Sequence, residues 1–487
     1  MKTIAELDPQ RVWKNFYELT KIPRPSKKEG KAVEFLYEFG KKLGLETVKD
    51  ELGNIIIRKP AVPGMENRRG IILQAHIDMV PQKNSDVDFD FETDAIKTRI
   101  VDNEWVYATG TTLGADNGMG CAVAMSVLEA EDLVHGPIEA LFTIDEETGM
   151  TGARGLKPGM LKGDILINLD SEDEGELYVG CAGGLDGQAV FHYTEEAVPA
   201  GSQGLKIALT GLLGGHSGMD IVLYRANANK VMTRLLLPLV RDLDARLISF
   251  EGGSLRNAIP REAFATVAVP GGKVEEAKKM LACVFEQVKA EYAATDTDAR
   301  LDVTPVTVEG GAIQQKVALN LLRALYACPN GVERMSDAMP GLVETSNNMA
   351  MVKSGNGQIA VSSLMRSSVD SAKEDLAERM RAVFELAGAE ISFVGGYSGW
   401  KPNMDSAILK EMKGVYKKLY GTEPAVKAIH AGLECGILGG IYPNWDMISC
   451  GPTIRSPHSP DERVNIATVS KLWNFVVEVL KEAPAAR

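Results

Sequence analysis

Histidine and acidic side chains recur in this chain, most of them at the end of a short run of apolar, strand-forming residues or in the loop after one. They fall at five places along the chain: His76-Ile77-Asp78, Asp116-Asn117, Glu146-Glu147, Asp170 and, far downstream, His458. Because ligands gather at the carboxyl ends of strands in an open α/β sheet, we expect these side chains to meet. Imidazole and carboxylate groups without cysteine suit a pair of divalent ions such as zinc. The pattern therefore predicts a hydrolase that uses two metal ions.

The first two places each allow a metal-binding and an ordinary structural interpretation. The apolar run 71–75 leads into His76, and alternation along an extended chain points His76 and Asp78 the same way. Asp78 would then orient a metal-binding imidazole, and the alternative is a core histidine beside a solvated aspartate. Asp116 follows a glycine-rich turn where a helix should begin. It is either a carboxylate that bridges two ions or a helix N-cap.

Three adjacent acids, Asp145, Glu146 and Glu147, follow the apolar run 138–144. Like charges crowded at the end of a buried strand raise one another's pKa unless cations neutralise them. One of Glu146 and Glu147 can bind metal while the other takes a proton from water. The alternative is a solvated acidic loop. Asp170 ends the run 164–169 and is the one acid of its segment that we assign to the site.

His458, the last of the five places, stands between two prolines. Proline fixes the backbone, which suits either a metal ligand or a plain turn.

Composition limits the class of protein. The 487 residues are 45% hydrophobic and 24% charged, as in ordinary globular proteins, and this length suggests about two to four domains. A net charge of −13 argues against nucleic acid or an anionic membrane as a partner. The six scattered cysteines are expected to be buried in a reducing compartment. With no secretory signal and no membrane-spanning apolar run, we expect a cytoplasmic protein.

The elements that must position these residues change in character along the chain. Strands and helices alternate up to about residue 186 and again after 400, which indicates an α/β sheet. Between them, a ferredoxin-like order of elements is predicted: strand 204–210, helix 222–240, strands 246–251 and 262–269, helix 273–293 and strand 300–308. A related half follows: helix 315–327, strands 342–352 and 357–365, helix 372–388 and strand 390–395.

The predicted fold class is therefore α/β, with a split catalytic domain at 1–186 and 401–487. This domain contains a mixed, mostly parallel sheet flanked by helices. An inserted α+β lid domain at 187–400 is built of two ferredoxin-like halves. Insertions of this kind are tolerated because the ends of the inserted domain lie close together.

Taken together, the five motifs resemble a known family. The strings are Gln-Ala-His76-Ile-Asp78, Gly-Ala-Asp116-Asn-Gly, Asp-Glu146-Glu147-Thr-Gly, Asn-Leu-Asp170 and Ser-Pro-His458. In order and in the wide final gap they are similar to the zinc-dependent exopeptidases that include aminoacylases, peptidase T and glutamate carboxypeptidases. Within this family the chain most resembles the aminoacyl-histidine dipeptidases, and the resemblance spans nearly all of its length.

The resemblance implies a role for each matching residue. Asp116 would bridge the two ions, with a cis peptide bond after it. His76 and Asp170 would complete one metal site, and Glu147 and His458 the other. Glu146 would be the general base and acid, and Asp78 would orient His76.

The resemblance extends to the inserted domain. His216 resembles the lid histidine that polarises the substrate carbonyl, Asn257 a lid asparagine, and Arg366 the arginine that holds the substrate carboxylate. The alternatives are a helix cap, a hairpin turn and an exposed strand residue. Glu434 resembles a residue near the substrate amino end and is expected to attract an ammonium group. The neighbouring His430 has no role in this scheme.

The resemblance thus implies a metallo-dipeptidase that cleaves unblocked dipeptides, Xaa-His and β-Ala-His among them, through attack by a metal-bridged water. The cofactors are two divalent cations per chain, assigned as zinc, with cobalt or manganese able to replace it. A homodimer is expected. One alternative is an N-acyl amino-acid deacylase with the same metal centre. Another is a non-catalytic peptide-binding protein on the same fold.

Overall fold

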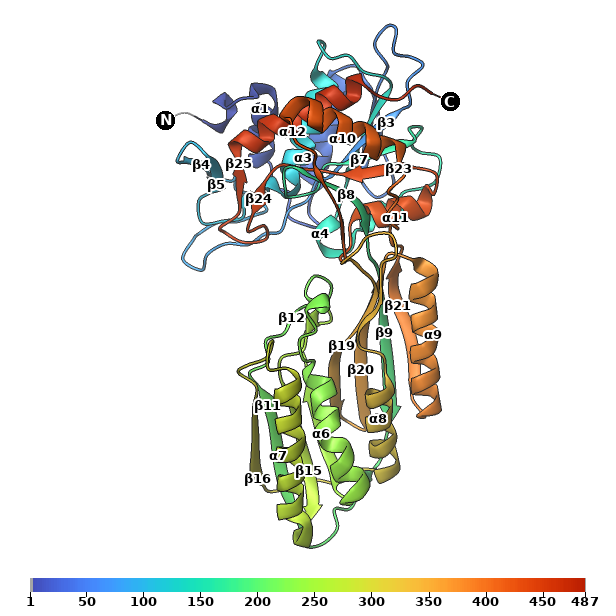
Figure 1. The fold of residues 1–487 in the computed structure, drawn as a ribbon. Helices are drawn as coiled ribbons and strands as arrows, with labels where there is room; N and C mark the ends of the chain where they lie inside the picture. The colour runs from blue at the N-terminus through green and yellow to red at the C-terminus, as the bar shows by residue number, and fades with distance from the viewer. Residues whose placement is uncertain (1–2, 487) are drawn as a thin grey trace. The chain divides into compact units, whose positions relative to one another are not determined.

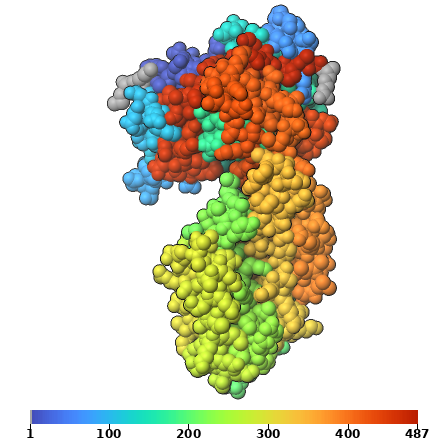
Figure 2. Space-filling view, in the orientation of Figure 1, coloured from blue at the N-terminus to red at the C-terminus, as the bar shows by residue number. Residues whose placement is uncertain are grey.

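The computed structural model describes residues 3–486 and divides into two compact units. Unit 1 takes the residues up to 180, then 400–428 and the chain from 433 on, and unit 2 takes 181–399 and 429–432. The blue N-terminal and red C-terminal segments therefore belong to the same unit (Figure 1), whose surface carries atoms of both colours (Figure 2). The inserted domain was expected at residues 187–400, and its main segment in the structure spans residues 181–399.

The main sheet of unit 1 carries parallel strands at its centre. Its strands run in the order β1 (Glu46–Lys49), β2 (Ile55–Lys59), β6 (Ile138–Thr143), β3 (Ile71–His76), β7 (Ile165–Asn168), β23 (Asp446–Ser449), β8 (Glu176–Cys181) and β22 (Ala425–Ile429). Pairing is parallel from β6 through β3 and β7 to β23, and antiparallel for β1–β2, β2–β6 and β23–β8. Every residue of β3, β6 and β7 is buried, as expected of parallel strands covered on both faces.

Helices and a small second sheet complete unit 1. The helices are α1 (Gln10–Thr20), α2 (Gly30–Lys42), α3 (Ala115–Glu129), α4 (Glu146–Gly149), α5 (Thr151–Gly155), α10 (Ala407–Tyr420), α11 (Glu434–Ile441) and α12 (Ile466–Lys481). The small sheet has the order β24 (Ile454–Arg455), β25 (Arg463–Asn465), β5 (Trp105–Ala108) and β4 (Thr98–Val101). Because β25 pairs with β5, the loop that carries His458 is attached to the segment that precedes Asp116.

Unit 2 is built on one nine-stranded sheet formed by two ferredoxin-like halves. The first half is β11 (Ser202–Thr210), α6 (Ala228–Asp242), β13 (Arg246–Gly252), β15 (Ala263–Pro270), α7 (Val274–Glu291) and β16 (Arg300–Val306). The second half is β9 (Gly183–His192), α8 (Gln315–Ala327), β19 (Val343–Gly355), β20 (Gln358–Ser367), α9 (Asp370–Leu386) and β21 (Glu390–Tyr397). The strand orders are β16-β11-β15-β13 and β19-β20-β9-β21, and antiparallel pairing of β13 with β19 joins them.

The predicted fold class is confirmed, and the structure supplies a strand that the sequence did not reveal. β9 opens the second half, so the first half is inserted in the second half between β9 and α8. One cluster of buried apolar side chains runs through both halves. The short strands β10 (Glu195–Glu196), β12 (Gly215–His216), β14 (Ala258–Ile259), β17 (Ala312–Ile313) and β18 (Gly331–Met335) complete the unit.

Two local expectations were wrong. The helix expected at 222–240 begins at Ala228, because the Asn227 side chain accepts hydrogen bonds from the N–H groups of Asn229 and Lys230 and so caps it. Cys283 is exposed, whereas the other five cysteines are buried as expected, and all six are free thiols. None of the helices among residues 3–486 is long and apolar enough to cross a membrane.

Candidate metal centre

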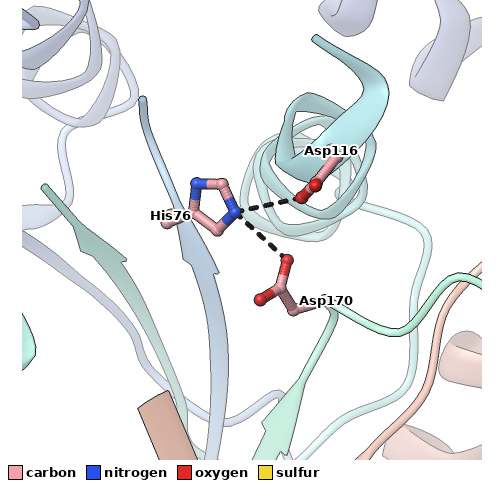
Figure 3. Close-up of side chains that lie close together, drawn as sticks. All are labelled: His76, Asp116 and Asp170. Carbon is pink, nitrogen blue, oxygen red and sulfur yellow. Dashed lines mark hydrogen bonds and ion pairs between the residues drawn. The ribbon is translucent and has the colours of Figure 1, made fainter. Parts of the chain in front are cut away.

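His76 ends the buried central strand β3 and is itself buried. Its Nδ1 lies 3.1 Å from the backbone oxygen of Asp78 and 3.4 Å from the Asp78 carboxylate. Its Nε2 faces Asp116 Oδ1 at 3.1 Å and Asp170 Oδ1 at 3.2 Å (Figure 3). Because Asp78 occupies Nδ1, the Nε2 atom is left to face the two carboxylates, which is the orientation that a metal-binding imidazole needs.

Asp116 stands between two histidines. It lies at the start of α3 but has non-helical backbone angles, and the peptide bond to Asn117 is cis, as the family resemblance implies. One carboxylate oxygen faces His76 Nε2 at 3.1 Å, and the other faces His458 Nε2 at 3.2 Å. A carboxylate with each oxygen directed at a different imidazole has the arrangement of a bridging ligand rather than of a helix cap.

His458 brings the most distant part of the chain to the site. It has a positive φ of 59°, its side chain is 51% exposed, and its Nε2 lies 3.0 Å from Glu147 Oε2. The hydrogen bonds with Asp116 and Glu147 raise the pKa of His458 to about 11. The five expected ligands thus fall into two sets that share Asp116. Within each set, the ligand atoms lie within 4.8 Å of one another: His76, Asp116, Asp170, and Asp116, Glu147, His458.

Asp78 also shapes the acidic turn after β6. Its two carboxylate oxygens accept hydrogen bonds from the N–H groups of Glu146, at 2.9 Å, and Glu147, at 3.3 Å. Both acids therefore start the short helix α4, where their side chains reach one site. A carboxylate oxygen of Glu146 lies within 4.8 Å of the ligand atoms of His76 and Glu147. Asp145 is used differently, because its carboxylate accepts hydrogen bonds from Thr148 and Thr151 and so braces the turn.

The residues at this site fit a pair of cations. Burial raises the pKa of Glu146 well above its ordinary value; the His76 ring opposes this rise and the Asp170 carboxylate adds to it. Burial also raises the pKa of Asp170. Glu147 Oε1 is buried and has no hydrogen-bond partner among residues 3–486. Burying this many carboxylates costs free energy unless positive charge lies beside them. The oxygen of Glu147 that has no partner is free to bind a metal ion.

Unit 2 brings His216 and Asn257 together on a short ribbon. His216 in β12 pairs with Ala258 in β14, and Ser217 donates a backbone hydrogen bond to the Asn257 carbonyl at 2.9 Å. The N–H groups of Gly218 and Met219 donate to His216 Nδ1, at 3.2 and 3.0 Å. The ring proton therefore sits on Nε2, which becomes a hydrogen-bond donor. The Asn257 side chain is exposed at the turn before β14.

Arg366 and His216 both lie beside Gly218 in unit 2. Arg366 in β20 is buried, and its Nε atom has no acceptor in the part of the chain that the structure describes. Burial lowers the pKa of His216, and the positive charge of Arg366 lowers it further. A Cβ built on Gly218 would lie 3.1 Å from the His216 ring and 3.2 Å from Arg366 Nε, so both side chains border one residue. Unit 2 thus offers a neutral imidazole donor next to a guanidinium.

Glu434, expected to attract a substrate ammonium group, is buried at the start of α11. The side chain is 0% exposed, and its Oε2 accepts hydrogen bonds from Gln74 Nε2 at 2.6 Å and Thr143 Oγ1 at 2.7 Å. Burial raises its pKa to about 7. Its Oε1 is buried and has no hydrogen-bond partner among residues 3–486, and the expected contact with a substrate ammonium group stays a prediction.

Sequence reasoning missed two further residues at the site, Arg24 and Glu462. Both are buried and bind backbone atoms next to the expected ligands. The only signal in the sequence was that Glu462 closely follows His458.

Comparison with known proteins assigns the class. Residues 72–482 match the model of the peptidase family M20/M25/M40. The chain belongs to this family of peptidases, which confirms the predicted resemblance and makes the protein an enzyme rather than a binding module.

Individual relatives narrow the comparison. The chain is 46% identical over 485 residues to the cytosol non-specific dipeptidase of Escherichia coli strain K12, with 100% of both chains covered. A solved structure of aminoacylhistidine dipeptidase from Vibrio alginolyticus is 48% identical, covers 99% of each chain and has a TM-score of 0.94. A tripeptidase from Staphylococcus aureus, at 18% identity, covers 98% of this chain and 99% of its own, and shares the fold with a TM-score of 0.57.

Proposed function

We propose that this protein hydrolyses the peptide bond of unblocked dipeptides, Xaa-His and β-Ala-His among them, at a two-metal centre. The observation that carries the proposal is the Asp116 carboxylate, whose two oxygens face His76 and His458. One ion would be held by His76 and Asp170, the other by Glu147 and His458, and Asp116 would serve both. We assign the ions as zinc, with cobalt or manganese able to replace it.

The reaction follows from the residues around this centre. Bound cations would lower the pKa of the attacking water and polarise the scissile carbonyl. Glu146 accepts a proton from the water as its oxygen adds to the carbonyl carbon, and then delivers that proton to the leaving amine as the C–N bond breaks. Its raised pKa suits this role, because a more basic carboxylate accepts a proton from water more readily.

Unit 2 supplies the remaining groups of the proposal. We assign to His216 Nε2–H the stabilisation of the developing oxyanion, because a neutral imidazole with Nδ1 already bonded presents that proton. Arg366 is assigned to the substrate carboxylate, since its guanidinium is buried and its Nε lacks an acceptor. Asn257 is assigned to substrate binding through its exposed amide. A carboxylate-binding arginine favours short substrates with a free C-terminus.

An N-acyl amino-acid deacylase would share the metal centre. A dipeptidase takes substrates with a free amino group, whereas a deacylase takes substrates whose amino group is acylated. The test is a metal-titrated assay of chelator-stripped protein with zinc, cobalt and manganese. Gly-His and β-Ala-His are compared with N-acetyl-His, which blocks the amine but keeps the carboxylate. We expect turnover of the free dipeptides only. Faster cleavage of N-acetyl-His would overturn the dipeptidase assignment in favour of the deacylase.

Glu146→Gln tests the mechanism. The amide keeps the size of the side chain but cannot accept the proton, so kcat should fall by about 100- to 10,000-fold. Metal content, measured by atomic emission, should stay at two ions per chain because Glu146 is not assigned as a ligand. Near-normal turnover in a fully metallated variant would remove Glu146 from the role of base.

The remaining expectations extend the proposal. The Escherichia coli relative is described as a cytosol enzyme, and we propose a cytoplasmic location and a homodimer for this protein as well. Light scattering coupled to gel filtration measures the oligomeric state directly.

A further inference from the structure

Two buried charged side chains that the proposed mechanism does not use hold the turn before Asp116. Arg24 and Glu462 are each 2% exposed. Each makes its hydrogen bonds to backbone atoms. Charged groups are rarely buried without a strong set of partners, so these contacts need an explanation.

Glu462 accepts hydrogen bonds from consecutive backbone N–H groups. Its Oε2 lies 2.7 and 2.9 Å from the nitrogens of residues 113 and 114, and its Oε1 lies 2.7 and 3.2 Å from those of residues 115 and 116. One carboxylate thus satisfies the turn that carries Asp116. Because Glu462 follows His458 in the loop between β24 and β25, the same contact fixes the His458 segment against Asp116.

Arg24 connects the same turn to the end of β3. Its Nη1 donates to the carbonyl oxygens of Ile77 at 2.8 Å and Asp78 at 3.3 Å, and its Nη2 donates to the Gly114 carbonyl at 2.6 Å. The Gly114 residue is therefore held at its N–H by Glu462 and at its carbonyl by Arg24. A planar guanidinium with several fixed donors is suited to joining separate carbonyls in this way.

The sequence leaves space for the guanidinium. Gly114 has a positive φ of 71°, and a Cβ built there would lie 2.5 Å from Arg24 Nη2. A Cβ on Gly118, in the first turn of α3, would lie 2.6 Å from the same atom. Asp116 and Asn117 have non-helical backbone angles, so the regular helix does not by itself fix the position of Asp116.

We infer that Arg24 and Glu462 are positioning residues that form a backbone clamp, setting Asp116 relative to His76 and His458 and so tuning affinity for the metal pair. This inference rests on the proposed two-metal function. The two contacts converge on one turn: Arg24 ties it to the segment after His76, and Glu462 ties it to the segment after His458. Movement of that turn would change both distances from the Asp116 carboxylate, now 3.1 and 3.2 Å.

Glu462→Gln and Arg24→Lys test the clamp with small changes of shape. An amide presents one acceptor and one donor, so two of the four N–H groups would lose their acceptor. Lysine keeps the positive charge but has a single nitrogen for carbonyls that the arginine reaches with two.

Glu139 and Arg58 offer a matched control pair, because Glu139 lies near the start of β6, at the opposite end of that strand from Glu146 and Glu147. Glu139, near the start of β6, is 6% exposed and accepts hydrogen bonds from the N–H groups of Lys162 and Gly163 at 2.7 and 2.8 Å. Arg58 Nε donates to it at 2.8 Å. Glu139→Gln and Arg58→Lys therefore make the same chemical changes in unit 1, on β6 and β2 and away from the ligands.

The measurement is titration of the metal-free full-length proteins with Co²⁺, followed by visible absorption and calorimetry, beside urea unfolding of the metal-free forms. We expect Glu462→Gln and Arg24→Lys to weaken Co²⁺ binding by about 10- to 100-fold, as loss of outer contacts to ligands does elsewhere. The absorption bands should also shift, because the ligand geometry changes. Glu139→Gln and Arg58→Lys should lose stability while keeping the wild-type Co²⁺ affinity and spectrum.

Wild-type Co²⁺ affinity in Glu462→Gln, or equal weakening in the control pair at equal loss of stability, would overturn the clamp. If Glu462→Gln does not fold, Glu462→Asp keeps the charge on a shorter side chain, and its Co²⁺ affinity decides the same point. Failure of the wild-type protein to bind two Co²⁺ per chain would instead overturn the proposed function on which the clamp depends.

Discussion

His430 gives a prediction that can be worked through from its surroundings. The imidazole is 6% exposed, its Nε2 lies 2.7 Å from Ser346 Oγ, and its Nδ1 is buried without a partner. Burial lowers the pKa of His430 to about 3, and the positive charge of Arg366 adds to this effect. We therefore expect a neutral ring in the folded protein and, at acid pH, a protonated ring in the unfolded chain.

The sign and size of the effect follow from linkage. The unfolded chain binds a proton near the ordinary pKa of 6.5, whereas the folded protein resists protonation down to a pKa of about 3. The unfolded state thus binds more protons between these values, so stability is present above pH 6.5 and falls as the pH falls toward 3. Between pH 7 and pH 5 the loss from this one residue is about 2 kcal/mol.

The assay compares wild-type protein with His430→Gln. The glutamine amide can still form a hydrogen bond with Ser346, but it does not titrate. Urea unfolding is followed by circular dichroism at pH 7 and pH 5, with tryptophan fluorescence as a separate report on unit 1, because all five tryptophans lie there. The free energy of unfolding of unit 2 should fall by about 2 kcal/mol more in the wild type than in the variant. His192→Gln is the control, since the His192 side chain is 55% exposed. An identical pH dependence in wild type and His430→Gln would refute the reasoning.

Three further predictions concern the site. Arg366→Lys keeps the charge but loses the guanidinium fork, so kcat/KM for dipeptides should fall roughly 10- to 100-fold, mainly through KM in steady-state kinetics; an unchanged KM would argue against carboxylate binding. Gly218→Ala would place a Cβ 2.1 Å from the His430 carbonyl oxygen, so we expect a loss of about 1–3 kcal/mol in urea unfolding and reduced kcat/KM. Chelation should abolish activity and lower the melting temperature measured by calorimetry, because metal at about 1,000 times its Kd adds about 4 kcal/mol; a melting temperature insensitive to EDTA would contradict the metal site.

Most of the metal-ligand candidates could be found from sequence because His76, Glu147 and Asp170 end or follow buried strands of the main sheet. His76 directly ends β3, and the acids near 146 follow β6. Parallel strands place their carboxyl ends at one edge, so strand assignment alone brings these side chains together. His458 could be added only through the family resemblance, because its approach to Asp116 depends on the pairing of β25 with β5.

The parts that the sequence did not reveal depend on contacts between distant backbone segments. The Arg24 guanidinium bonds carbonyls 53 and 90 positions away, and the carboxylate of Glu462 bonds N–H groups 346 to 349 positions away. Backbone atoms are common to all residues, so neither contact leaves a pattern in the sequence. The surroundings of Glu434 were hidden for a related reason, since its contacts with Gln74 and Thr143 are visible only once β3 and β6 are paired.

Because one ferredoxin-like half is inserted in the other, the inner half is the first of the two to have all of its strands during synthesis. The inner half, β11 to β16, has all of its strands once residue 306 is synthesised. The outer half holds β9 from the start, but its other three strands, β19, β20 and β21, follow between residues 343 and 397, and the main sheet of unit 1 waits for β23 at residues 446–449. Domains fold as units during synthesis, so maturation runs from the middle of the chain outward. Until translation is nearly finished, the nascent chain therefore carries its first strands with edges and apolar faces uncovered, which makes it a substrate for chaperones.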